Sequence, residues 1–290
     1  MNIQIPNLPA RGARRAGRGE FSPRPAPRAP RRAAGFTMIE IALCLAIIGI
    51  GLVAIVGVLP IGMNTQRDTR EATVIGQDAT MLLEAIRNGS RGLDDLTNNI
   101  YLITNNWALY DNKGNLKDSG QNGYTFGGST IPNNWPQGSS YFPITNGLRI
   151  IGLLTTPEYT DGVNPITNLF FGGYSNHIVA YVRSLSGLVA EKPPQDNPIM
   201  QEDAFSYRIL SVNAPMAADP NALANSSYAR QLAGNLREIR LLFLWPQLPN
   251  GNVGAYRQSF RAEIGGQIFG INDVGQRLYF YQSQSFTNAQ

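Results

Sequence analysis

The feature that most constrains this chain is an apolar run from Ile41 to Met63, 23 residues without a charged side chain. A helix of that length spans roughly 35 Å, enough to cross a bilayer core of about 30 Å. A secretory signal peptide would have a shorter apolar region that ends in a small-residue cleavage site, and no such site follows here. The run therefore predicts a membrane anchor. It places Cys44, the single cysteine, inside the bilayer, where no intramolecular disulfide can form.

The segment before the anchor carries the basic character of the chain. Residues 1–35 contain eight arginines and one acid, which leaves 16 basic and 19 acidic side chains in the rest. Four prolines between positions 23 and 30 forbid a helix, and repulsion among the arginines favours a disordered leader. The positive-inside rule puts the N-terminal end of the anchor in the cytoplasm. Because the remaining chain has no basic excess, no nucleic-acid partner is predicted.

The helix is predicted to continue beyond the anchor with one apolar stripe. The residues of the stripe follow each other at spacings of three and four: Ala72, Ile75, Ala79, Leu82 and Ile86. Asn88-Gly89 is a C-terminal stop signal, and Pro60 with nearby glycines should weaken or kink the helix. Residues 36–63 are thus the membrane half of one interrupted helix, and residues 64–89 are its amphipathic half.

Residues 90–290 alternate short apolar segments with Gly, Asn and Pro, which predicts a strand-rich globular domain. Segments 111–140 and 187–203 are predicted as surface loops. Ile239–Trp245 is apolar on both faces beyond Arg240, which is typical of a central strand covered on both sides. The fold class is therefore α+β, a long N-terminal helix packed on a C-terminal antiparallel β-sheet domain. The predicted strands are Tyr101–Tyr110, Leu148–Leu154, His177–Leu185, Phe205–Val212, Leu236–Trp245, Phe260–Ile264 and Leu278–Phe286.

Catalytic and metal-binding side chains are scarce. His177 is the only histidine and the one cysteine lies in the anchor, which excludes most transition-metal sites and His-dependent nucleophiles. The segment Asp111–Asn115 resembles a fragment of a calcium loop, but its spacing departs from that motif and favours a hairpin turn. We therefore predict no enzyme activity, metal or cofactor. Calcium stays as the alternative for a cofactor, and a carboxylate pair brought together by the fold as the alternative for catalysis.

The junction between leader and anchor reads Gly35-Phe36-Thr37-Met38-Ile39-Glu40. Gly35 has no Cβ, so a peptidase can approach the backbone closely. A carboxylate such as Glu40 within a spanning helix costs about 2.5–3.5 kcal/mol at the bilayer centre, and such residues usually have a partner. A cut after Gly35 would create a cationic amine at Phe36, about one helical turn away. The alternative for Glu40 is an interfacial carboxylate that reaches the headgroups.

This junction resembles the prepilin-type signal of type IV pilins and type II secretion pseudopilins, in which Thr37, Met38 and Ile39 complete the motif. The resemblance implies that a prepilin peptidase and methyltransferase removes residues 1–35 and N-methylates Phe36. It also implies that Phe36 and Glu40 pair between subunits. Expected partners are other pilins or pseudopilins in a helical filament, an inner-membrane assembly platform and the lipid bilayer.

The implied location is the bacterial inner membrane, crossed once with the globular domain in the periplasm, and then the filament. The large mature length favours a minor or pilin-like member, and leaves open a type II secretion pseudopilus or a type IV pilus. The alternative function is a membrane-anchored adhesion module that recognises a glycan, protein or DNA through Trp107, Trp135 and the many Tyr and Asn residues. A twin-arginine export signal at Arg31-Arg32 lacks the rest of that motif.

Overall fold

The computed structural model describes residues 35–89, 94–126, 140–186, 205–216, 219–248, 251–273, 276–282 and 285–286. The predicted leader up to residue 34, the predicted loop 187–203 and Trp135 lie outside these residues. The chain divides between Leu59 and Pro60 into two compact units, and helix α1 (Met38–Asn88) contributes to both. The helix is continuous through Pro60, so the predicted interruption is absent. It ends before Gly89, whose φ of 66° suits a glycine stop, as predicted.

In the second unit, α1 has one buried face. The predicted stripe is confirmed at Ile75, Ala79, Leu82 and Ile86, each fully buried. Ala72 was wrongly included, because it is exposed while the neighbouring Glu71 is buried instead. Glu71 accepts a hydrogen bond from Arg67 Nε at 2.8 Å, so its carboxylate is paired one helical turn away.

The described residues form an eight-stranded sheet with the order β3-β2-β1-β5-β6-β7-β8 and with β4 paired to β5. All pairs are antiparallel except β2–β3. The strands are β1 (Ile100–Tyr110), β2 (Leu116–Phe126), β3 (Ser140–Ile144), β4 (Tyr159–Thr160), β5 (Gly173–Arg183), β6 (Ser206–Pro215), β7 (Leu236–Gln247) and β8 (Val253–Gly265). A separate hairpin pairs β9 (Gln267–Asp273) with β10 (Gln276–Gln282). The short helices are α2 (Leu96–Asn99), α3 (Gly147–Leu154), α5 (Pro220–Asn225) and α6 (Ser227–Asn235). The α+β prediction is confirmed.

Six of the predicted strands overlap observed strands, and the segment Leu148–Leu154 does not. It forms helix α3, which begins where the Asn146 side chain accepts a hydrogen bond from Arg149 N at 3.0 Å. The predicted loop 111–140 was also wrong in part, because it contains β2. Strand β2 is rich in Gly, Asn, Asp and Ser, so its position depends on backbone pairing with β1 and not on an apolar pattern.

Strand β7 lies inside the sheet between β6 and β8, as predicted for a central strand. Its cover is different from the prediction. Ile239, Leu241 and Phe243 are fully buried, whereas Leu242 and Leu244 on the opposite face remain partly exposed. Only one face of β7 is therefore covered, and its apolar outer face reflects β-propensity more than burial.

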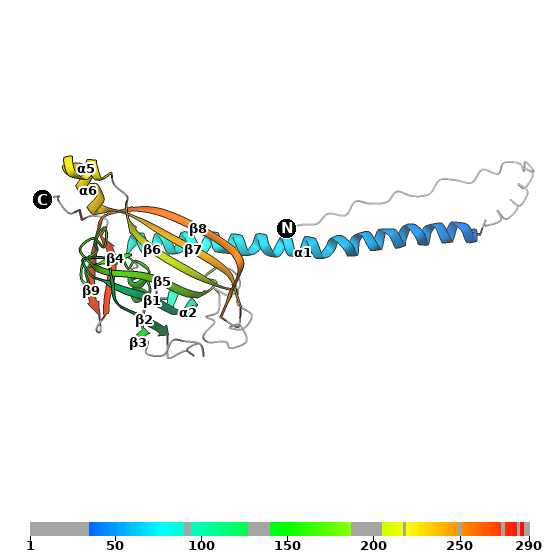
Figure 1. Cartoon of the computed structure of the whole chain (residues 1–290). Coiled ribbons are helices and arrows are strands. Elements are labelled where there is room, and N and C mark those ends of the chain that lie inside the picture. The colour runs from blue at the N-terminus through cyan, green and yellow to red at the C-terminus, as the bar shows by residue number, and fades with distance from the viewer. Residues whose placement is uncertain are drawn as a thin grey trace, which may run out of the picture. The chain divides into compact units, whose positions relative to one another are not determined.

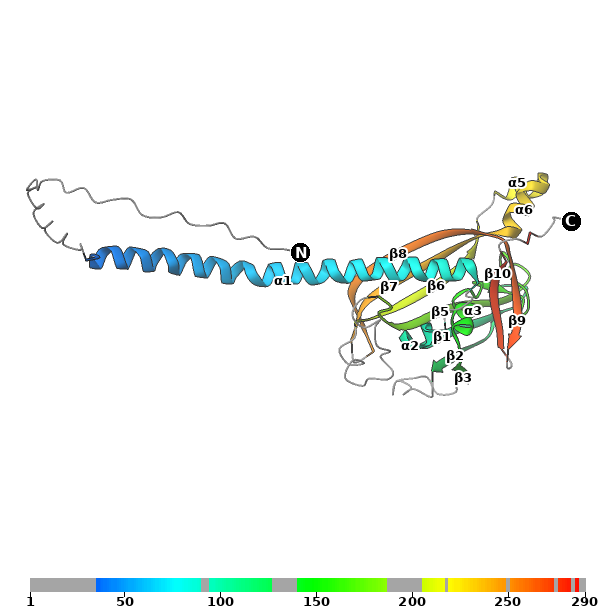
Figure 2. The same ribbon diagram turned by 180° about the vertical axis from the view of Figure 1, so that it is seen from behind.

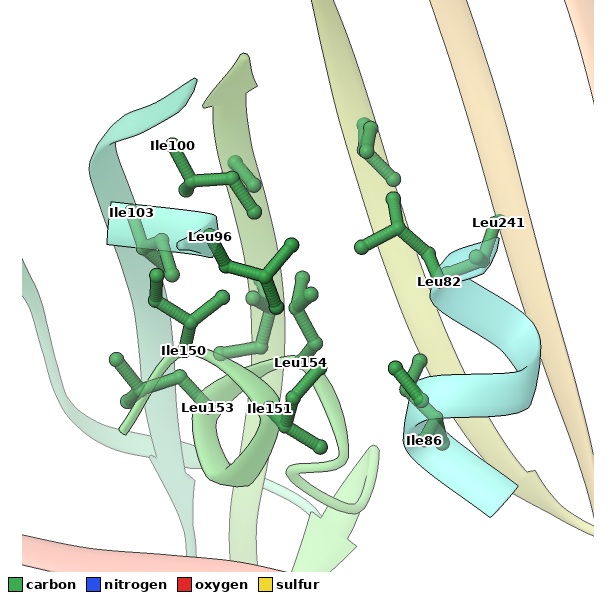
Figure 3. Packing of buried hydrophobic residues seen from close by; sticks show 14 of the residues in the cluster. Leu82, Ile86, Leu96, Ile100, Ile103, Ile150, Ile151, Leu153, Leu154 and Leu241 are labelled. Carbon is green, nitrogen blue, oxygen red and sulfur yellow. The ribbon is translucent and has the colours of Figure 1, made fainter. Parts of the chain in front are cut away.

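The core lies on one side of the sheet. The C-terminal part of α1 lies behind the sheet in Figure 1 and in front of it in Figure 2, where α3 and the β9–β10 hairpin are seen on the same side. Leu82 and Ile86 of α1 belong to the same buried cluster as Ile151 and Leu154 of α3 and Leu241 of β7 (Figure 3). The domain is thus two layers, a sheet covered by two helices and a hairpin.

A buried carboxylate joins α1 to the sheet. Asp78 is 1% exposed, and its oxygens accept hydrogen bonds from Tyr207 Oη at 2.7 Å and Leu185 N at 3.0 Å. The hydroxyls of Ser184 and Ser186 also donate to it. Burial raises the pKa of the Asp78 carboxyl above its ordinary value, although these hydrogen bonds act in the opposite direction.

This raised pKa predicts a pH-dependent stability. Between the ordinary value of 3.8 and the folded-state pKa, the native protein holds a proton on Asp78 that the unfolded chain has released. The contribution of protonated Asp78 to the unfolding free energy is therefore complete below pH 3.8 and is lost as pH rises through the folded-state pKa. The quantity to compare is the difference between the unfolding free energies of the unsubstituted protein and of Asp78→Asn. We expect this difference to fall as pH rises from about 3 to about 7.

Urea unfolding of residues 60–290, one of the two compact units, measures this difference at each pH. Tyr207→Phe is the matched control, because it removes one hydrogen bond to Asp78 but keeps the carboxyl. It should lower stability without abolishing the pH dependence. A difference that is flat or rises with pH would contradict the assignment to Asp78.

Candidate functional site

The predicted site residues form one continuous stretch at the start of α1. Gly35, Phe36 and Thr37 precede the helix, which begins at Met38. A Cβ added to Gly35 would meet nothing within 4 Å, and Phe36 is 80% exposed. Among the described residues beyond its chain neighbours, none lies close enough to Gly35 to hinder an approaching enzyme.

Thr37 and Glu40 together cap the first turn of α1. Thr37 O accepts from Glu40 N at 3.0 Å and Ile41 N at 3.2 Å, and Thr37 Oγ1 accepts from Glu40 N at 3.3 Å. In return, Glu40 Oε2 accepts from Thr37 N at 3.4 Å. This reciprocal arrangement is a capping box, which satisfies otherwise unpaired backbone donors. The capping role of Thr37 was not predicted from the sequence, although the T-x-x-E spacing is the signal for it.

The capping box determines where the carboxylate of Glu40 lies. It turns back toward the N-terminal end of the helix and reaches the nitrogen of Thr37, one residue from Phe36. An ionised carboxylate has about four acceptor positions, so capping Thr37 leaves capacity for a further donor. A charged amine created at Phe36 would be a stronger partner than a neutral backbone N–H.

The first part of α1 presents apolar side chains in all directions. From Phe36 to Leu59 its large hydrophobic residues are between 49% and 88% exposed. Within the described residues, α1 is the one helix long and apolar enough to cross a membrane, and none of its most apolar part is buried. A helix that is hydrophobic all round needs lipid or other apolar helices around it.

Other residues singled out in the sequence have ordinary surroundings. Asp111 Oδ1 accepts hydrogen bonds from Lys113 N at 2.8 Å and Asn115 N at 2.9 Å, which closes the predicted β1–β2 hairpin and lowers the pKa of Asp111. His177 is exposed on β5. Among the described residues, no three His, Cys, Asp or Glu side chains gather where a metal ion could bind.

A comparison with known protein families supports the signal predicted at the Gly35–Glu40 junction. A family model described as the prokaryotic N-terminal methylation motif matches residues 30–56, which include Gly35, Phe36, Glu40 and the start of the apolar run. Neither a curated protein nor a solved structure matches the chain significantly. The motif and the unburied apolar helix together lead to one conclusion: this chain carries the prepilin-type methylation signal of type IV pilins and pseudopilins, on a helix that anchors it in a membrane.

Proposed function

We propose that this chain is a pilin-like structural subunit of a type II secretion pseudopilus or a type IV pilus. A prepilin peptidase cleaves it between Gly35 and Phe36 and methylates the new terminus, and α1 then carries the subunit into a helical filament. The observation that carries the proposal is the methylation motif, which extends into an apolar helix whose most apolar part is not buried inside the described chain. We assign no catalytic residue, because a structural subunit needs none.

The charge distribution supports a defined orientation. The arginines before Gly35 hold the start of α1 in the cytoplasm, so the sheet domain lies in the periplasm. Cleavage removes these arginines together with the leader. The processed subunit then keeps one positive charge at its start, the amine of Phe36, close to the carboxylate of Glu40.

That amine gives Glu40 a partner in assembly. The cost of holding a carboxylate in the bilayer falls when a cation neutralises it. Within one chain, Glu40 is already turned toward the backbone of Thr37. The amine of Phe36 on a neighbouring subunit can approach the same carboxylate from outside, which neutralises both charges and determines the stagger between the two helices.

The first prediction concerns processing. Co-expression with a prepilin peptidase should yield a product without residues 1–35 and with one methyl group on Phe36, as measured by intact mass. Gly35→Val places a branched side chain where the enzyme approaches the backbone, so its cleavage should be about tenfold slower or worse. Gly49→Val is the matched control, because an added Cβ there also meets nothing within 4 Å. An intact leader, or a mature terminus elsewhere, would refute the proposal.

The second prediction separates assembly from processing. Glu40→Ala should be cleaved and membrane-bound but absent from sheared filaments, because the carboxylate that pairs with the neighbouring amine is missing. Thr37→Ala keeps the carboxylate and removes a cap worth about 1 kcal/mol, so it should still assemble once processed. Glu84→Ala, which removes a half-exposed acid paired with Arg87, is the control for general loss of charge. Normal incorporation of Glu40→Ala would exclude the pairing role.

A further inference from the structure

The sheet domain contains a surface cavity of about 280 Å³, slightly smaller than the roughly 300–1,000 Å³ of drug-sized ligand sites. Its walls come from β1, β2, β3, β4, β5 and β10, from the end of α3 and from the chain that follows α3. Five aromatic rings line it: Trp107, Tyr124, Phe142, Tyr174 and Tyr279. Four side-chain amides do so as well: Asn105, Asn122, Asn176 and Gln276.

The inner face of the sheet changes from apolar to polar at this cavity. Along β1, Ile103 is fully buried in the core, and Asn105 and Trp107 follow at alternate positions on the same face. On the neighbouring strands the register places Asn122 opposite Asn105 and Asn176 opposite Trp107. A face that only packed against other elements would continue with apolar residues. The amides therefore mark a part of the face that is built to meet something polar.

Three polar atoms in these walls lack a hydrogen-bond partner. In the part of the chain that the structure describes, five buried side-chain atoms are unpaired, and Asn105 Oδ1, Gln276 Nε2 and Arg277 Nε belong to residues that line the cavity. Asn105 is 9% exposed, so its free oxygen has little access to bulk water. Folded proteins rarely leave buried polar atoms unpaired without a reason.

The free oxygen of Asn105 is held in a defined orientation. Asn105 Nδ2 donates to Asn176 Oδ1 at 3.0 Å, and Asn176 Nδ2 donates to Pro157 O at 3.2 Å. This chain of amides uses the donor of Asn105 and leaves its acceptor unpaired. That oxygen has almost no accessible surface, so a ligand group that donates a hydrogen bond would reach it after a small movement of the wall.

The aromatic rings provide apolar faces beside these groups. Gly120 makes room for Trp107, since a Cβ at Gly120 would lie 2.7 Å from Trp107 Cζ2. The indole therefore lies across β2, and the ring of Tyr174 meets it nearly edge-on, with the centroids 6.0 Å apart. Tyr124 of β2 stacks with Phe142 of the neighbouring strand β3, with the ring centroids 5.6 Å apart.

We propose that this cavity binds a sugar residue, such as the end of a glycan chain. A sugar hydroxyl both donates and accepts, which matches an unpaired acceptor at Asn105 and an unpaired donor at Gln276. The C–H face of the ring can pack on Trp107, as aromatic side chains combine apolar contact with polar neighbours at binding sites. No carboxylate lines the described walls, so the ligand is neutral or acidic. The proposal is independent of filament assembly.

Binding can be measured on the full chain in a zwitterionic detergent without a sugar headgroup, which would otherwise compete. The probes are glucose, galactose, mannose, N-acetylglucosamine and glucuronic acid, titrated by saturation-transfer NMR. At least one should bind, and Trp107→Ala should weaken it about tenfold by removing the stacking surface. Phe171→Ala is the control, because Phe171 is an 85% exposed aromatic that does not line the cavity, and it should leave binding unchanged.

Gln276→Ala distinguishes a ligand site from a packing role. Its Nε2 makes no hydrogen bond within the described structure, so truncation should leave the melting temperature unchanged while weakening sugar binding about three- to tenfold. This variant also decides the matter if Trp107→Ala fails to fold. The proposal is overturned if none of the five sugars binds, if binding survives Gln276→Ala and any folded Trp107→Ala variant, or if Phe171→Ala abolishes it equally.

Discussion

The fold of this chain depends on the different surroundings that the two halves of α1 require. Up to Leu59 the helix is apolar all round and buries none of that surface inside its own chain. Hydrophobic side chains exposed on this scale need lipid or the same surface of another subunit. From Ile75 onward most of the apolar residues keep to one face, which the sheet domain covers, and Met81 is an exposed exception. One helix thus presents a surface suited to a membrane at one end and enters an ordinary protein core at the other.

Two carboxylates on this helix illustrate how each half handles charge. Asp78 lies within the protein core, where Tyr207, two serine hydroxyls and a backbone N–H surround it. Glu40 has a backbone N–H and the hydroxyl of Thr37 near it, and these are weak partners for a charge in a bilayer. The deficit at Glu40 is the physical reason to look for a cation, and the proposed cleavage after Gly35 would supply one at Phe36.

Local sequence signals predicted the features that are determined by residues close together in the chain. The anchor and the strand β7 follow from continuous apolar runs, and the stop at Gly89 follows from glycine chemistry. Helix α3 was read as a strand because its apolar run is too short for periodicity to decide, although Asn146 was available as a cap. Asp78 could not be predicted, since nothing in its own segment shows that Tyr207 would meet it.

The cavity could not be predicted from the sequence either, because its walls come from strands that are distant in the chain and adjacent only through the sheet order. The signal at Gly35–Glu40 could be recognised from the sequence, because its residues are contiguous and their order and spacing define it.

The central claim is that the apolar half of α1 packs against the same half of neighbouring subunits. The arrangement of helices in an assembled filament tests this claim most directly. A cryo-electron microscopy reconstruction should show the apolar halves of α1 packed together in the filament core, with the amine of Phe36 within hydrogen-bond distance of Glu40 from a neighbouring subunit. A filament in which these halves of α1 do not contact each other, or in which Glu40 has no neighbouring amine, would contradict the account.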